Sequence, residues 1–123
     1  MLKVGVLGAG HLGKIHLRLL QQSTKYELVG FYDENHENAE KISKEFGYTR
    51  FSTIARLISA VDVIDIVTPT LSHFKCAKVA IKSGKHVFIE KPISNTVEEA
   101  EEIMALANEY NVKGQVGHVE RFN

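Results

Sequence analysis

The stretch "KVGVLGAGHLGKIH", residues 3–16, decides the fold class of this 123-residue chain. It starts as an apolar run that ends at Leu7, and glycines then follow at positions 8, 10 and 13. Beyond the glycines, apolar residues recur near helical spacing as far as Leu19. We therefore predict a buried strand over residues 2–7, a glycine-rich turn, and a helix from His11 to about Gln22.

The rest of the chain alternates short apolar runs with longer segments of helical period. Five further strands are predicted at residues 26–33, 48–51, 61–68, 85–90 and 112–119. Helices are predicted between them at residues 35–47, 53–60, 72–84 and 96–111. This alternation, with near-continuous apolar strands, is typical of a parallel sheet covered on both faces. Six strands in this length match a doubly wound α/β fold, the Rossmann fold, with strand order 3-2-1-4-5-6.

Residues that favour helix ends support these boundaries. The predicted N-caps are Asn35, Thr53 and Ser72, and Thr96 forms a capping box with Glu99. Two of the helices are predicted to stop at glycines, Gly47 and Gly84. Within residues 35–47, the apolar side chains predicted to share the buried face are Ala39, Ile42 and Phe46.

Composition narrows the class of protein. Lysine plus arginine and aspartate plus glutamate both number 15, and this zero net charge argues against a duplex-DNA binder. The N-terminus lacks the pattern of a signal peptide or a membrane span, and the single cysteine, Cys76, suits a reducing compartment. The six histidines show no ligand spacing with other donors, so no metal is predicted. We expect a soluble, cytoplasmic protein without nucleic-acid or membrane partners.

The glycine turn carries the first candidate binding site. In Gly8-Ala9-Gly10-His11-Leu12-Gly13, the first glycine allows the tight turn and the second lets a pyrophosphate approach the backbone. The third lets the helix pack closely on the strand, and the helix N-terminus favours phosphate. The loop, with His11 and Leu12 in it, is therefore predicted to bind a dinucleotide. The alternative is a glycine turn with a structural role alone.

Asp33 supports the same prediction and indicates the cofactor. It ends the second predicted strand, 20 positions after Gly13, where an acid accepts hydrogen bonds from the adenosine ribose. Glu34 adds a second negative charge, and no arginine or lysine lies between Asp33 and Lys41. A 2′-phosphate would be repelled there, so NAD is favoured over NADP. The alternative is a solvated turn that caps the next helix.

Residues with unusual chemistry gather at the carboxyl ends of the predicted strands, where open parallel sheets bind ligands. Besides the glycine loop and Asp33, they are Thr68-Pro69-Thr70, Glu90-Lys91-Pro92 and Gly117-His118. A random scatter would use both edges of the sheet. The coincidence favours a ligand site at this edge.

The glycine loop, "DVIDIVTPTLSH" (62–73) and "SGKHVFIEKPIS" (83–94) resemble the N-terminal domain of the Gfo/Idh/MocA family. Its most distinctive mark is Glu-Lys-Pro preceded by Gly-Lys-His-Val. The resemblance covers the whole chain and implies hydride transfer between a nicotinamide cofactor and a sugar, polyol or related compound. The tail "GHVERFN" is similar to members linked to amino-sugar or nucleotide-sugar metabolism.

The resemblance also implies roles for single residues. Lys91 would lie beside the nicotinamide and touch the substrate hydroxyl, and Glu90 would lie near the nicotinamide ribose. Four more residues would line the cofactor groove or begin the following helix: Thr68, Pro69, Thr70 and His73. Lysine is normally a cation, and Glu90 opposes its deprotonation, so Lys91 is predicted to stabilise charge while another residue moves the proton. The alternative is an exposed surface pair.

Other polar residues have weaker claims, and the roles of His118 and Arg121 stay open. His16 is predicted to be structural, and Cys76 is predicted to pack. Family members continue into a second α/β domain that supplies most of the substrate pocket and the oligomer interface. Residues 1–123 would thus be a cofactor domain with little activity alone, in a homo-oligomer when full length. Two alternatives remain, a nicotinamide-binding sensor without catalysis and a Rossmann-like assembly domain without a ligand.

Overall fold

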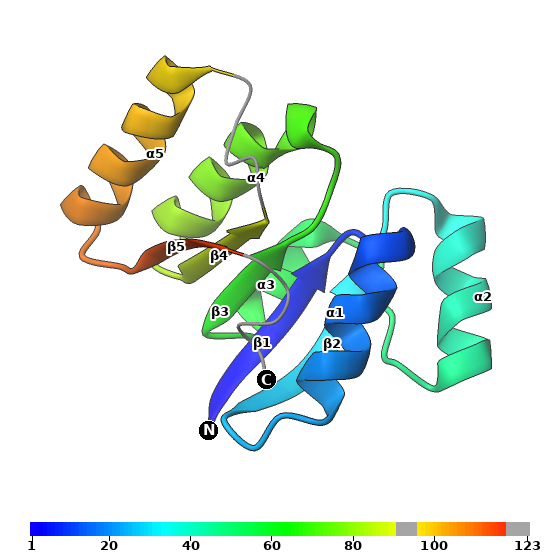
Figure 1. Cartoon of the computed structure of the whole chain (residues 1–123). Helices are drawn as coiled ribbons and strands as arrows, with labels where there is room; N and C mark the ends of the chain where they lie inside the picture. The colour runs from blue at the N-terminus through cyan, green and yellow to red at the C-terminus, as the bar shows by residue number, and fades with distance from the viewer. Residues whose placement is uncertain (91–95, 118–123) are drawn as a thin grey trace.

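The computed structural model describes residues 1–90 and 96–117, except the side chains of residues 70 and 71, and contains one five-stranded parallel sheet (Figure 1). The strand order is β2-β1-β3-β4-β5. The elements in chain order are β1 Leu2–Leu7, α1 His11–Gln21, β2 Tyr26–Tyr32, α2 His36–Phe46, α3 Ile54–Ser59, β3 Val63–Ile66, α4 Thr70–Lys82, β4 His86–Glu90, α5 Val97–Glu109 and β5 Gly114–Gly117.

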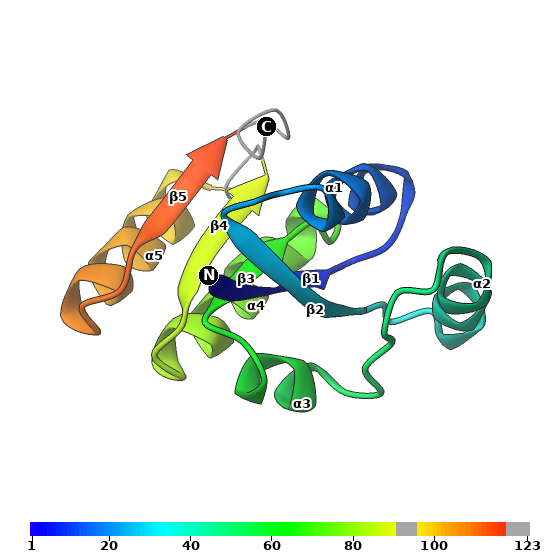
Figure 2. The same ribbon diagram turned by 90° about the horizontal axis from the view of Figure 1, so that it is seen from below.

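Helices lie on both faces of the sheet, as the alternating pattern predicts. Figure 2 shows α1 on one face, with α3, α4 and α5 on the other. The larger apolar core lies under α3, α4 and α5 and includes Ile64, Ile81 and Ile103. A second core lies under α1 and includes Leu17 and Phe31. Within the described residues, no helix is long and apolar enough to cross a membrane.

The central strands are buried on both faces. All four residues of β3 are buried, and Val87, Phe88 and Ile89 of β4 are each at most 6% exposed. Because parallel strands covered by helices have no solvent face, they need a continuous apolar run instead of an alternating one. The predicted class, a doubly wound parallel α/β sheet, is confirmed.

The number of strands differs from the prediction. The segment expected as a third strand, residues 48–51, makes one isolated parallel bridge between Arg50 and Phe31. The amide of Phe31 donates to the Thr49 carbonyl, and the amide of Phe51 donates to the Phe31 carbonyl. Only five residues separate Gly47, which ends α2, from the N-cap Thr53, so the chain turns away before a longer ladder can form. The described sheet therefore has five strands instead of six.

Most predicted helix ends are confirmed by their capping bonds. The side chains of Asn35, Thr53 and Thr96 each accept a hydrogen bond from the backbone amide three residues later. Gly47 adopts the left-handed conformation, with φ of 79°, and ends α2. Gly84, with φ of 77°, directly follows Ser83, the C-cap residue of α4.

Two predictions about helix positions are wrong. Ser72 is not the N-cap of α4, because the helix already starts at Thr70, after Pro69. The φ of −55° at Pro69 suits a helix entrance, and the Ser72 amide donates to the Pro69 carbonyl. Phe46 is not buried with Ala39 and Ile42, since it lies in the last turn of α2, is 51% exposed and stacks on Tyr48.

Candidate functional site

A groove of about 800 Å³ runs along the carboxyl ends of β1, β2 and β3. It collects most of the residues predicted for cofactor binding, although they come from three separate parts of the sequence. These residues are Gly8, Gly10, His11, Leu12, Gly13, Asp33, Thr68 and Pro69. The sheet topology produces this arrangement, because β1 lies between β2 and β3.

Each glycine of the loop meets a different constraint. Gly8 has φ of +101°, and a Cβ there would lie 2.8 Å from the Val67 carbonyl group. A Cβ at Gly13 would lie 2.1 Å from the Gly8 oxygen, so this glycine lets α1 pack on β1. A Cβ at Gly10 would meet nothing within 4 Å. The first and third glycines thus serve the fold, and the second leaves space beside the groove.

The start of α1 offers polar backbone groups to this space. Its N-cap is Gly10, which has no side chain to accept a hydrogen bond from the first turn. The first amides of a helix have no partner within the helix, so they remain available to an anion. The first turn of α1 also holds no acidic residue that would repel one.

Asp33 is held in place by Asn38, a residue that sequence analysis did not single out. The side-chain amide of Asn38 donates to Asp33 Oδ2 at 2.7 Å and to the Ala9 carbonyl at 3.2 Å. The backbone amide of Asn35 donates to Asp33 Oδ1 at 3.2 Å. Asn38 therefore joins the acid at the end of β2 to the glycine loop. The signal for this role in the sequence is a polar residue on the groove side of α2, one turn after the N-cap Asn35.

The third wall of the groove follows β3. Thr68, Pro69, Ser72 and Cys76 line it. Burial raises the pKa of the Cys76 thiol, and the neighbouring Thr68 partly opposes this rise. The thiol is therefore kept in its neutral form, which agrees with a packing role and not with a nucleophile.

His73 does not line the groove. It is 2% exposed, and its Nε2 lies 2.7 Å from the Thr68 carbonyl oxygen, to which it donates. This bond ties the first turns of α4 to the chain segment that follows β3. The structure thus places His73 behind the groove wall, where it supports Thr68.

Glu90 also lies outside the groove, in a buried cluster with His16 and Asp65. His16 Nδ1 is 2.6 Å from Asp65 Oδ2, and His16 Nε2 is 3.6 Å from Glu90 Oε2. Burial raises the pKa of Asp65, an effect opposed by its hydrogen bond with His16. The cluster was not predicted. Asp65, the second of two acids in the apolar run "VDVIDIVT", was an indication in the sequence of a buried partner.

Four residues with predicted or undecided roles lie wholly or partly outside the described structure. Lys91, His118 and Arg121 lie outside the described residues, and only the backbone of Thr70 is described, as the first residue of α4. In the parts of the chain that are described, no three His, Cys, Asp or Glu residues are arranged to hold a metal ion.

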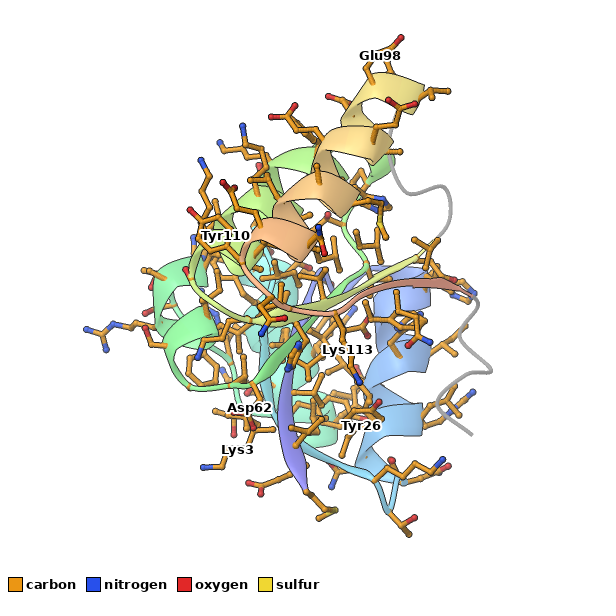
Figure 3. The ribbon with its side chains drawn as sticks, turned by 90° about the vertical axis from the view of Figure 1, so that its left-hand side faces the viewer. Lys3, Tyr26, Asp62, Glu98, Tyr110 and Lys113 are labelled. Atoms are coloured by element: carbon orange, nitrogen blue, oxygen red, sulfur yellow. The ribbon has the colours of Figure 1, made fainter. Side chains whose placement is uncertain are left out.

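A second hollow, of about 540 Å³, lies against the same sheet but contains none of the predicted site residues. It runs along the amino-terminal halves of the strands, and Tyr26 and Lys113, labelled in Figure 3, both line it. Asp65 reaches it from β3. The groove beside the glycine loop remains the better candidate site, because parallel sheets bind ligands at the carboxyl ends of their strands.

Known proteins resemble this chain in sequence and in structure. A UDP-N-acetylglucosamine 3-dehydrogenase from Acidithiobacillus ferrooxidans is 37% identical over 98% of this chain and 38% of its own length. Its crystal structure matches with a TM-score of 0.89, over 98% of this chain and 39% of that one. A glucose-6-phosphate 3-dehydrogenase from Bacillus subtilis is 34% identical over 99% of this chain and 35% of its own length.

A third relative was solved with a cofactor. The structure of a Synechocystis biliverdin reductase in complex with biliverdin and NADP⁺ is 26% identical, with a TM-score of 0.88, over 97% of this chain and 38% of that one. This chain therefore spans little more than a third of the length of each of these relatives. The family model described as "Oxidoreductase family, NAD-binding Rossmann fold" matches residues 2–118. The chain thus belongs to the Gfo/Idh/MocA oxidoreductase family and corresponds to its NAD-binding Rossmann domain.

Proposed function

We propose that this chain is the cofactor-binding part of an NAD-dependent dehydrogenase that acts on a sugar, a polyol or a nucleotide- or amino-sugar. The observation that carries the proposal is the groove, in which the glycine loop and Asp33 lie together. The open space at Gly10 and the uncapped start of α1 fit a pyrophosphate. The family match and the two sugar dehydrogenases among the relatives support the reaction class.

In this proposal each part of the groove has a task. The backbone of residues 8–13 holds the pyrophosphate, and Asp33 accepts hydrogen bonds from the adenosine ribose. Thr68 and Pro69 form the opposite wall, with His73 supporting Thr68 from behind, and Thr70 would follow them at the start of α4. Lys91, directly after β4, stabilises the charge that develops on the substrate oxygen, and Glu90 lies next to it in sequence. NAD supplies the hydride acceptor when bound.

The choice of NAD over NADP rests on charge. Asp33 and Glu34 both line the groove, and a 2′-phosphate there would face two carboxylates. Asn38 and the Asn35 amide donate to Asp33, and these bonds hold its carboxylate in place. The relative solved with NADP⁺ indicates that this fold can also hold the phosphorylated cofactor. The groove of this chain favours the one without the extra phosphate.

Titration with NADH and with NADPH, followed by fluorescence, tests the proposal. We expect saturable binding of NADH and at least about tenfold weaker binding of NADPH, because the 2′-phosphate would face two carboxylates. A tenfold difference in Kd corresponds to about 1.4 kcal/mol. Asp33→Asn should weaken NADH binding and narrow the difference between the two cofactors. Glu45→Gln, at an exposed position of α2 away from the groove, is the control. No saturable binding of either cofactor would refute the proposal, and tighter NADPH binding would reverse the cofactor choice.

Identifying the substrate requires an assay with the native protein that contains this chain. We propose UDP-N-acetylglucosamine and glucose 6-phosphate as first substrates, because they are named for the two relatives. NADH formation at 340 nm measures turnover. The proposal includes a second, substrate-binding domain, a homo-oligomeric assembly and a cytoplasmic location.

A further inference from the structure

The peptide group between Thr68 and Pro69 belongs to the groove wall that follows β3. Proline has no amide hydrogen, so the Thr68 carbonyl oxygen is the only hydrogen-bonding atom that this peptide group can offer. His73 Nε2 lies 2.7 Å from that oxygen and donates to it. His73 is 2% exposed and belongs to α4, outside the groove lining. The imidazole therefore holds this peptide group without taking space from a ligand.

The residues on either side of Thr68 are held by backbone bonds instead. The Val67 amide donates to the Leu7 carbonyl of β1 at 2.8 Å. The Ser72 amide donates to the Pro69 carbonyl at 2.8 Å. Neither bond depends on the identity of a side chain. A substitution at position 73 can therefore remove the bond to Thr68 while both neighbouring bonds remain.

The glycine loop packs against the same segment, one peptide group earlier. A Cβ at Gly8 would lie 2.8 Å from the Val67 carbonyl oxygen and 2.9 Å from the Thr68 nitrogen. This close contact fixes the peptide group before Thr68 from the side of the loop. Loss of the His73 bond should therefore free the Thr68–Pro69 peptide group and leave the loop in place.

The order of the strands assigns the Thr68–Pro69 wall to one half of the proposed cofactor. β1 lies between β2 and β3, and neighbouring strands are about 4.8 Å apart. Asp33, after β2, is proposed to bind the adenosine ribose, and the loop after β1 is proposed to bind the pyrophosphate. A dinucleotide that crosses these strand ends in that order brings its nicotinamide half to the end of β3.

We propose that His73 is a positioning residue for the nicotinamide half of the cofactor, because it orders the Thr68–Pro69 peptide group before the cofactor binds. The inference rests on the proposed function, since it requires a dinucleotide in the groove. A wall that is already ordered loses less conformational entropy on binding, and this difference raises the affinity. The adenosine diphosphate half depends on Asp33 and the glycine loop instead. His73 acts through Thr68 and does not touch the cofactor.

The test uses two ligands and the native protein that contains this chain. NADH carries both halves of the cofactor, whereas ADP carries only the adenosine and two phosphates. In His73→Leu, a side chain of similar size cannot donate to the Thr68 carbonyl. In His73→Gln, the side-chain amide takes the place of Nε2 and can donate. Isothermal titration calorimetry measures the Kd of each ligand, and thermal unfolding measures the stability of each variant.

His86→Leu is the matched control. His86 Nδ1 also bonds the backbone, since it accepts a hydrogen bond from the Lys113 amide at 3.0 Å. His86 is the first residue of β4, at the end of the strand opposite the groove. The control therefore loses one histidine bond to the backbone far from the ligand.

A positioning role predicts that the two ligands respond differently. His73→Leu should bind NADH about threefold to tenfold more weakly than the wild type, because the wall loses one buried hydrogen bond. It should bind ADP with wild-type affinity. His73→Gln should recover most of the NADH affinity, and His86→Leu should match the wild type with both ligands. A structural role alone would lower the two affinities together and would not be rescued by glutamine.

The outcomes that overturn the inference differ in what else fails. Wild-type NADH affinity in His73→Leu overturns it, and so do equal losses for NADH and ADP or a His73→Gln variant that recovers nothing. In these cases the wild type still binds NADH, and the proposed function stands. If His73→Leu does not fold, His73→Asn replaces it, because its shorter side chain does not reach the Thr68 carbonyl. A wild-type protein that binds no NADH refutes the proposed function and removes this inference with it.

Discussion

The side chain of Asn38 donates a hydrogen bond to the carboxylate of Asp33 at 2.7 Å, while the same amide nitrogen lies 3.2 Å from the carbonyl oxygen of Ala9. This pair fixes the acid that ends β2 relative to the glycine loop. Asn38→Ala should weaken NADH binding about threefold to tenfold, because Asp33 loses a side-chain donor worth about 1 kcal/mol. Fluorescence titration measures the effect, with Glu45→Gln as the control on the same helix. Equal affinities in Asn38→Ala and wild type would contradict this role.

The second and third glycines of the loop should separate binding from folding. Gly10→Ala is expected to leave the thermal midpoint near that of the wild type, because its Cβ meets no atom within 4 Å. It should lower NADH affinity, because the methyl group occupies the space proposed for the pyrophosphate. Gly13→Ala should cost about 1–3 kcal/mol of unfolding free energy, because its Cβ would lie 2.1 Å from the Gly8 oxygen. Denaturant unfolding and NADH titration of both variants check this, and the reverse pattern would be incompatible with it.

Cys76 should give the fold a pH dependence on the alkaline side. Burial raises its pKa above the ordinary value of 9.0, so the unfolded chain loses the thiol proton at a lower pH than the folded chain. The contribution of Cys76 to stability is therefore complete below pH 9.0 and declines as the pH rises through the folded-state pKa. Cys76→Ala should remove this part of the decline in urea unfolding between pH 8 and pH 11. A decline identical in both proteins would contradict the burial effect.

Lys91 is predicted to act on the reaction more than on cofactor affinity. In the native protein, Lys91→Ala should lower kcat by at least about a hundredfold, because it removes a cation proposed to stabilise developing charge. The Kd for NADH should change little. Lys85→Ala, just before the opposite end of β4, is the matched control. Full turnover in Lys91→Ala would favour a binding module without catalysis at this residue.

A structural feature can be predicted from the sequence when the residues that determine it lie close together along the chain. The tasks of Gly8 and Gly13 could be predicted because they follow from backbone sterics within a few residues. The caps at Asn35, Thr53 and Thr96 are equally local, since each bonds an amide three residues away. Even here, Pro69 displaced the predicted cap at Ser72, because a proline already suits the entrance of a helix.

Contacts between distant parts of the chain could not be predicted in the same way. His16 and Asp65 are 49 positions apart, and no pattern in either segment names the other. The position of Asp33 beside the glycine loop was predictable from strand order, but its bond to Asn38 depends on how α2 is turned. The prediction of a full third strand was wrong for a related reason. The length of that segment is limited by the number of residues between Gly47, which ends α2, and Thr53, which caps α3.

The segment beside β2 also affects how the molecule avoids self-association. β2 is an edge strand of the described sheet, and an open edge invites pairing with another chain. The Thr49 carbonyl and the Phe51 amide occupy the outward peptide groups of Phe31, and the lack of a side chain at Gly30 lets this segment come close. The bridge between Phe31 and Arg50 therefore covers part of this edge. Displacing the segment would expose a template for intermolecular β-sheet and aggregation.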